Sequence, residues 1–275
     1  MKKLQKLVGH GFRSMGRHRL RCFFMMLGTF VGVAALTVVV ALGQGTRQEV
    51  MGRIDRMFSG SSILLSSGAM GMGGGPRDAP SNTLTLEDLA ALEASVDGIL
   101  TWDPMQMAGA REVIWNGNSS EVRIMGHSER AEVVWNRGVS RGSFLTESDV
   151  ASSARVALVG ETLATEVFGD TDPIGEQIRI GTVPFDVVGV LAVQGIDPHG
   201  WDRDNEVHIP ITTMMRRLLN VDYIMSSKII VAEGVDLEPM VEDIENVLRE
   251  RHALAEAEPN DFAMITPVQV EAVSY

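Results

Sequence analysis

The sequence predicts an α+β protein with a single N-terminal transmembrane helix and a large two-lobed domain outside the membrane. Three observations support this class: a long uncharged stretch near the start, an uneven distribution of charge on its two sides, and strand–helix–strand patterns at both ends of the remainder. We expect residues 59–135 and 223–266 to form one split lobe that contains βαβ units. Residues 136–222 are then inserted as a second lobe of mixed helices and strands.

The uncharged stretch covers residues 22–43, between Arg21 and Gln44. A helix needs about 20 apolar residues to cross a bilayer, whereas the apolar part of a secretory signal is about 7–15 residues long. Eleven of the residues are Phe, Leu or Val, and they favour insertion by about 3–6 kcal/mol before small and polar residues are counted. We therefore predict a membrane span, and a long signal peptide cleaved near Ala41–Gly43 stays the alternative.

Charge predicts the orientation of this span. Residues 1–21 hold seven of the 24 Lys and Arg and no acid, so 17 basic residues remain against 36 Asp and Glu. Positively charged flanks stay in the cytoplasm, which places the acidic remainder outside the inner membrane. An acidic domain also excludes nucleic acid as a partner, because phosphates require a cationic surface.

The basic segment 1–21 is predicted to form a cytoplasmic amphipathic helix. Its apolar residues recur at steps of three and four: Leu4, Leu7, Val8, Phe12 and Met15. Such a helix can lie on anionic membrane lipid or contact a cytoplasmic partner, and the two do not exclude each other. Cys22 is the single cysteine, so no intrachain disulfide can form, and it is either a lipid-facing side chain or a palmitoylation site.

Turn and capping signals divide the first part of the domain. The expected elements are, in order, a helix at Thr46–Phe58, a strand at Ser61–Ser67, a mobile loop at Gly68–Asn82, a helix at Thr85–Val96 and strands at 98–115 and 119–127. Thr85 and Asp88 have the spacing of a capping box, which begins a helix. Asn116–Ser120 contains Asn-Gly between two alternating runs, which indicates a hairpin.

The middle of the domain alternates short strands and helices. The expected elements are, in order, a loop from Arg141, a strand at Val156–Val159, a helix from Glu161 to Gly169, strands at Gln177–Ile180 and Phe185–Leu191 turned by residues 181–184, a strand at Glu206–Pro210 and a helix to about Leu219. Gly169 is a typical helix-ending residue. Gly175 and Gly189 are expected to serve turns or tight backbone approach, with Pro173 adding rigidity, rather than a binding site.

The last part repeats the strand–helix–strand pattern. The expected elements are a strand at Ser226–Ala232, a helix at Asp236–His252 and a strand at Asp261–Thr266. Asp236 is the expected cap, and the acids early and bases late in the helix match its dipole. The periodicity predicts these core-facing residues: Val241, Ile244, Val247 and Leu248.

No catalytic, cofactor or metal site is predicted. Acids and histidines gather in one segment: His199, Asp202, Asp204, Glu206 and His208. An EF-hand would need glycine where Val207 stands, and a strand at Glu206–Pro210 would split the ligands between two faces. We therefore expect a solvated acidic loop that can contact a partner. Met70 and Met72, the other conceivable metal ligands, lie in a loop without His or Cys.

The remaining chemistry-bearing residues support no enzyme. The glycines of "GMGGG" are not followed by the lysine of a P-loop, and no nucleophile elbow, H-E-x-x-H or C-x-x-C motif is present. The four tryptophans could line a substrate groove or pack in the core and at its rim: Trp102, Trp115, Trp135 and Trp201.

Several segments follow one another in an order typical of one family. They are "RLRCFF…LGQG" (19–45), "RGSFLTESD" (141–149), "RVALVG" (155–160), "DPIGEQIRI" (172–180), "FDVVGVL" (185–191) and "LRERH" (248–252). Together they resemble MacB-type ABC transporter permeases, in which the first span leads into a periplasmic core domain. The resemblance covers nearly the whole chain and does not identify the cargo.

The resemblance implies a permease subunit without a catalytic site of its own. Its expected partners are a cytoplasmic ABC ATPase, a second permease copy, membrane lipid and, on the outer side, a periplasmic adaptor or outer-membrane component. Movement driven by ATP would reach the periplasmic domain through the spans and export a drug, peptide or lipoprotein.

The end of the chain departs from the family pattern. Three further spans would follow the periplasmic domain, whereas this chain ends at "TPVQVEAVSY" (266–275). We therefore expect either part of a longer permease or a truncated product, which alone would not couple ATP hydrolysis to movement. The alternative function is a single-span anchored adaptor or binding protein without transport activity. A cleaved, secreted enzyme would need a catalytic constellation that the sequence lacks.

Overall fold

The structure is a computed structural model of the 275-residue chain, and it describes residues 27, 30–35, 37, 62–68, 82–197 and 200–266. The chain divides into two compact units, Met1–Arg56 and Met57–Tyr275.

In the first unit, every described residue is helical and exposed. Within this helix the Thr37 hydroxyl donates a hydrogen bond of 2.8 Å to the Val33 carbonyl oxygen. Over the described residues of the chain, no helix is both long and apolar enough to cross a bilayer. Most of the predicted span at 22–43 lies outside the described residues, as do the helices predicted at 1–21 and 46–58 and most of the loop at 68–82.

In the second unit, strands from both ends of the sequence form one sheet in the order β10–β1–β9–β2. They are β1 (Ser62–Ser67), β2 (Ile99–Trp115), β9 (Ser226–Val231) and β10 (Phe262–Ile265). All three neighbouring pairs are antiparallel, so β1 runs parallel to β2 with β9 between them, and β9 runs parallel to β10 with β1 between them. Each strand–helix–strand unit thus has one strand of the other unit between its own two strands.

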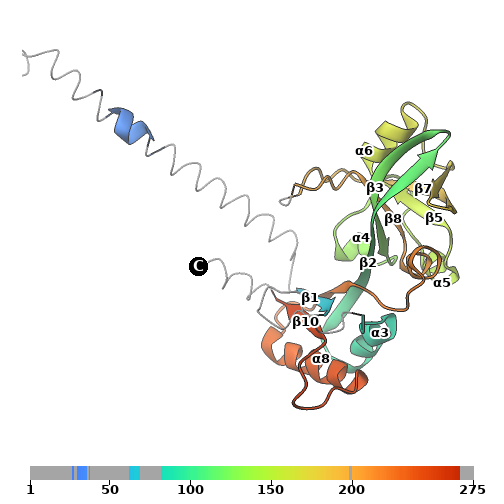
Figure 1. Ribbon diagram of the computed structural model, residues 1–275. Helices are drawn as coiled ribbons and strands as arrows, with labels where there is room; N and C mark the ends of the chain where they lie inside the picture. Colours follow the sequence, from blue (N-terminus) through green and yellow to red (C-terminus); the bar gives the residue numbers. More distant parts are fainter. Residues whose placement is uncertain are drawn as a thin grey trace, which may run out of the picture. The chain divides into compact units, whose positions relative to one another are not determined.

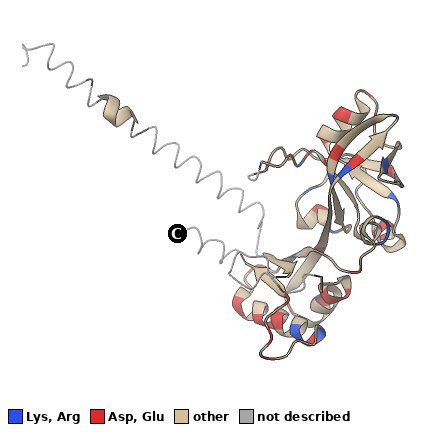
Figure 2. Cartoon of the chain, in the orientation of Figure 1, with Lys and Arg blue, Asp and Glu red and all other residues tan. Residues whose placement is uncertain are grey.

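Helices α3 (Leu86–Ser95) and α8 (Leu237–Arg251) lie beside this sheet (Figure 1) and share a core with it. Their exposed turns carry acidic side chains (Figure 2). The capping box of Thr85 and Asp88 is confirmed, and so is the Asp236 cap. The predicted inner face of α8 is also confirmed: Ile244 and Leu248 are fully buried, and the two valines are half-buried against the same core.

The second half of β2 belongs to a sheet that closes on itself. In this ring β2 pairs with β3 (Asn118–His127), β3 with β8 (Glu206–Pro210), β8 with β5 (Val156–Val159), β5 with β7 (Val183–Leu191), β7 with β6 (Gln177–Ile180), and β6 with β2. A short strand, β4 (Val139–Gly142), also pairs with β7. Strand β2 pairs with β9 up to Met105 and with β3 from Gln106 onward, and an irregularity follows between Met107 and Ala110, where Gly109 has a φ of 69°.

Apolar side chains fill the interior of the closed sheet. Alternate residues of β3 and β8 point inward, among them Val122, Ile124, Val207 and Ile209. Two helical segments complete this core: α6 (Glu161–Leu163) with the π-helix η1 (Ala164–Phe168), and α7 (Ile211–Thr213) with the π-helix η2 (Met214–Leu219). The helices predicted here are confirmed in position, but most of each is π-helical rather than α-helical.

Three local predictions need correction. The turn predicted over residues 181–184 has only two residues, because Gly181 at a φ of 58° lets Ile180 pair directly with Val183. The loop predicted from Arg141 contains the end of β4 and a helix, α5 (Glu147–Ser152), which starts at a capping box of Thr146 and Asp149. The short helix α4 (Ala131–Val134) was not expected.

The backbone approach at Gly142 gives a test of the β4–β7 contact. Gly142 has a φ of 80°, and a Cβ atom there would lie 2.3 Å from the Val188 carbonyl oxygen. We expect Gly142→Ala to lower the free energy of unfolding by about 2–4 kcal/mol, through backbone strain and overpacking. Gly181→Ala, at positive φ but with nothing within 4 Å, should cost only about 1 kcal/mol. Urea unfolding of both variants measures the difference, and equal costs would contradict it.

Candidate functional site

A buried cluster of polar side chains lies on the outer face of β3 and β8, where these strands approach the first half of β2. We call it the polar junction and define it by seven residues: Asp103, His127, Ser128, Trp135, Arg137, Glu206 and His208. Since Val207 and Ile209 point into the closed sheet, Glu206 and His208 point outward, yet they are only 0% and 4% exposed. The segment that covers them is α4 with the residues after it, and α4 contacts both β2 and β9.

Glu206 is the central acid of the polar junction. Its Oε1 lies 2.9 Å from Arg137 Nη1 and 3.4 Å from Arg203 Nε. Its Oε2 lies 3.5 Å from Arg123 Nη2. Burial alone would raise the pKa of Glu206, but the His208 imidazole and the guanidinium charges outweigh it and lower the pKa to about 2. Glu206 is therefore ionised at neutral pH.

Arg137 extends the junction to a surface loop. Its guanidinium donates to Gln194 Oε1 over 2.9 Å and to the Arg203 carbonyl oxygen over 2.5 Å. The Asp204 carboxylate accepts the backbone amides of Gln194 and Gly195, each over 2.8 Å. One arginine, itself only 2% exposed, thus fastens both ends of the 192–205 loop to β8.

Asp103 is the second buried acid, and it joins β2 to the end of β3. Its Oδ1 accepts hydrogen bonds from the backbone amide and hydroxyl of Ser128, over 2.9 and 2.6 Å. Its Oδ2 accepts the indole N–H of Trp135 over 2.8 Å and lies 2.7 Å from His127 Nδ1. Lys228 Nζ stands 5.2 Å from the Trp135 ring centroid, and burial lowers the pKa of this lysine to about 8.

Two imidazole rings connect the halves of the polar junction. The centroids of His127 and His208 are 4.7 Å apart, with an interplanar angle of 38°. His208 Nε2 lies 3.4 Å from Glu206 Oε1. Burial lowers the pKa of His208 to about 4, although Glu206 acts to raise it. His208 is therefore neutral at pH 7.

A second polar cluster ties α3 to α8 and β10. Arg251 Nε donates to Asp88 Oδ1 over 2.6 Å. His252 lies between two carboxylates, with Nδ1 2.8 Å from Asp261 Oδ1 and Nε2 3.3 Å from Asp88 Oδ2. Burial would raise the pKa of Asp88, but the hydrogen bonds from Arg251 and Thr85 hold it below its usual value.

The acidic segment does not form the solvated loop that the sequence predicts. Asp204 and Glu206 are buried, because Arg137, far away in the sequence, supplies the compensating charge. Asp202 accepts the Thr162 hydroxyl and the Asp204 amide. Of the other candidate ligands, His208 belongs to the polar junction, while His199, Met70, Met72 and Cys22 lie outside the described residues. Within the described ranges, no group of three or more His, Cys, Asp or Glu could hold a metal ion.

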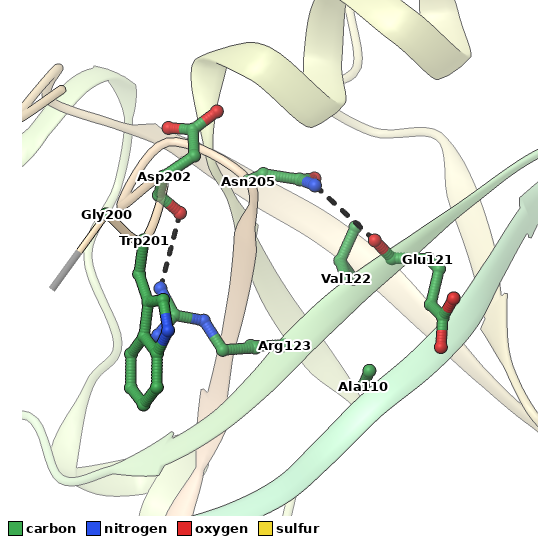
Figure 3. A pocket seen from close by; sticks show the side chains of 8 residues that line it. All are labelled: Ala110, Glu121, Val122, Arg123, Gly200, Trp201, Asp202 and Asn205. Carbon is green, nitrogen blue, oxygen red and sulfur yellow. Dashed lines mark hydrogen bonds between the residues drawn. The ribbon is translucent and has the colours of Figure 1, made fainter. Parts of the chain in front are cut away.

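The described surface has a hollow of about 260 Å³ beside the polar junction (Figure 3). The Arg123 guanidinium lies 4.5 Å from the Trp201 ring centroid and donates to the Asp202 carbonyl oxygen. The rest of the lining comes from Ala110, Glu121, Val122, Gly200 and Asn205. The volume is slightly below the roughly 300–1,000 Å³ of typical small-molecule sites.

The structure does not gather the four tryptophans into one groove. Trp201 lines the hollow and is 53% exposed. Trp135 donates to Asp103, Trp102 to Glu93 and Trp115 to Glu176, each from its indole N–H. The expected structural glycines are confirmed, since Gly175 has a φ of 86° and a Cβ at Gly189 would lie 2.7 Å from the Ser143 carbonyl oxygen.

The fold and the polar junction define a mixed α/β domain, and within its described residues the two largest hydrophobic cores lie under α3 and α8 and inside the closed sheet. The model of the MacB-like periplasmic core domain matches residues 22–247, and the chain belongs to this family.

Curated relatives agree with this membership. They include the macrolide export ATP-binding/permease protein MacB of Rhodospirillum rubrum, 33% identical over 87% of this chain, and that of Bdellovibrio bacteriovorus, 28% identical over 94%. The pyoverdine export ATP-binding/permease protein PvdT of Pseudomonas entomophila is 30% identical over 88%. The chain spans only 36%, 40% and 36% of these three relatives, in that order.

Solved structures show the same fold at low sequence identity. The periplasmic region of MacB from Actinobacillus actinomycetemcomitans has a TM-score of 0.66 at 18% identity, over 80% of this chain and 95% of that one. The extracellular domain of the transporter YknZ from Gram-positive bacteria has a TM-score of 0.60 at 17% identity, over 74% of this chain and 99% of that one.

Removal of the Glu206 charge tests the electrostatic role of the polar junction. Glu206→Gln leaves the buried Arg137 without its carboxylate, so we expect the free energy of unfolding at pH 7 to fall by about 3 kcal/mol. Glu121→Gln is the control, because Glu121 is an exposed residue on the neighbouring strand β3, and it should change stability by less than about 0.5 kcal/mol. Urea unfolding measures both, and a cost below 1 kcal/mol for Glu206→Gln would refute the assigned role.

The depressed pKa of Glu206 also predicts a pH dependence. The pKa is lowered from 4.5 to about 2 in the folded protein, so its stabilising effect is complete above pH 4.5 and is lost as the pH falls toward 2. Between pH 4.5 and 3 the stability difference between wild type and Glu206→Gln should narrow by about 1.5 kcal/mol. Urea midpoints at the two pH values check this, and a constant difference would mean that Glu206 titrates normally.

Proposed function

We propose that this chain supplies the periplasmic domain of a MacB-like export permease, in which residues 22–43 anchor the domain to the inner membrane and the domain works on its outer side. The observation that carries the proposal is the extent of the family match, which includes the uncharged segment as well as the domain up to residue 247. The basic residues before that segment and the acidic residues after it support a cytoplasmic N-terminus.

In this proposal the chain transmits movement and carries out no catalysis of its own. A cytoplasmic ABC ATPase would drive the membrane helix, and a second copy of the permease would complete the transporter. The domain is suited to transmit movement because β2 runs through both sheets and the polar junction fixes the covering segment to them. The lobes predicted at 59–135 with 223–266 and at 136–222 would be the parts that move.

The cargo is proposed only by class. The relatives are named for export of macrolides and of pyoverdine, so we propose a drug, peptide or lipoprotein, delivered with the help of a periplasmic adaptor or outer-membrane component. An anchored adaptor or binding protein without transport activity is the alternative outcome of the tests below.

Reporter fusions test the proposed topology. Alkaline phosphatase, which folds only outside the cytoplasm, should be active when it is fused after residue 266 and inactive when it is fused at residue 21. A green fluorescent protein that folds only in the cytoplasm should give the reverse pattern. A cytoplasmic signal from residue 266, or a soluble mature protein that lacks its first 43 residues, would contradict the proposal.

Co-purification separates the permease from the anchored adaptor. The tagged natural gene product, extracted from native membranes, should retain an ABC ATPase and a second permease copy. A variant with the tag but without residues 1–21 is the control for contacts through the basic segment, and it should retain less ATPase. Membrane insertion without any associated ATPase would favour the adaptor.

A further inference from the structure

The proposed transmission makes no use of the ability of the two histidines of the polar junction to take up protons. His127 ends β3 and His208 lies within β8, so the pair is located where the closed sheet meets the first half of β2. Both rings are almost fully buried, at 4% exposure. The rings form a tilted pair with centroids 4.7 Å apart. Two imidazolium cations at that distance would repel each other in a poorly solvated site, so the packing of the pair depends on protonation.

Every element around the pair presents a charge to it. The charged groups are Glu206, Arg203 and Asp204 on β8 and the turn before it, Arg123 on β3, Arg137 on the segment after α4, Asp103 on β2 and Lys228 on β9. Four of these seven groups are cations and three are carboxylates. A proton on His208 therefore adds a positive charge to a poorly solvated site that already holds several cations.

The two rings differ in their contacts. His127 Nδ1 lies 2.7 Å from Asp103 Oδ2. His208 is 3.4 Å from Glu206, but three guanidinium groups already neutralise that carboxylate. A proton on His208 therefore faces Arg137 and the neighbouring ring. Separation of the covering segment from β8 removes Arg137 and admits water to both rings, while His127 stays beside His208 because β3 and β8 remain paired.

We propose that His208, packed against His127, forms a proton-sensitive latch, which holds the covering segment and residues 192–195 on β8 at neutral pH and releases them in acid. A role of the latch in regulating export rests on the proposed function, which places the domain outside the inner membrane, where the pH follows that of the medium. The latch itself depends only on the packing of the polar junction. Export would then respond to external acidity through the fit of the covering segment.

The linkage between protonation and opening gives the pH range. In the closed state the pKa of His208 is about 4, against 6.5 for an exposed histidine. The open state therefore binds more protons between these values, and the closed state loses stability as the pH falls from 6.5 toward 4. At pH 4.5 the open population should be roughly 70 times that at pH 7.5.

Hydrogen exchange of the full chain in lipid nanodiscs tests the latch. After correction for the intrinsic pH dependence, protection of amides 131–137 and 192–195 should fall by tens of fold between pH 7.5 and 4.5, while protection of α8 stays constant. His208→Gln should abolish this fall, because glutamine does not titrate. His252→Gln, at the histidine held between Asp88 and Asp261, is the matched control and should leave the fall at 131–137 intact.

His127→Gln keeps the proposal falsifiable if His208→Gln does not fold. It removes the neighbouring ring, so a proton on His208 should be less unfavourable in the closed state. The closed state then stays stable in more acid solution, and the loss of protection should move to lower pH. The latch is refuted if the wild type keeps its protection at pH 4.5, or if either junction variant opens at the same pH as the wild type. A cytoplasmic signal from the reporter fusions would refute the proposed location of the domain, but the hydrogen-exchange results would still decide whether the latch exists.

Discussion

The buried ion pair of Glu206 and Arg137 is the interaction on which the arrangement of the domain depends. The two side chains are 0% and 2% exposed, and their nearest atoms are 2.9 Å apart. An unpaired charge at such a site costs several kcal/mol, so neither residue can be buried without the other. Arg137 also holds Gln194, 57 residues further along the chain, and the Arg203 carbonyl. The pair therefore decides how the segment after α4 sits against the 192–205 loop and against β8.

This constraint explains how two separate hydrophobic cores act as one unit. Apolar packing holds α3 and α8 on their sheet and fills the closed sheet, but it is non-directional and does not fix one core relative to the other. Strand β2 provides a continuous backbone between them, and Asp103 on β2 binds His127, Ser128 and Trp135 beside the second core. The transmission of movement that we propose needs this kind of directional, geometry-dependent connection.

Local sequence signals predicted most elements of the fold, whereas long-range pairing could not be predicted. The Asn116–Gly117 turn, the Thr85 cap and the inner face of α8 follow from residues only a few positions apart, and the structure confirms them. The Thr146 and Asp149 capping box carried the same signal and could have been found. Closure of the second sheet depends on pairs such as Val113 with Ile180, which no local pattern indicates. The acidic segment was interpreted as solvated because its counter-charge, Arg137, is distant in sequence.

A double-mutant cycle on Arg137 and Glu206 tests this account most directly. The two residues are replaced singly and together by apolar residues of similar size, Arg137→Met and Glu206→Leu, and the free energy of unfolding is measured at pH 7. We expect each single change to cost about 3 kcal/mol or more and the double change to cost much less than their sum, with a coupling of at least about 2 kcal/mol. A coupling near zero would show that the pair does not hold the three segments together, and it would contradict the account.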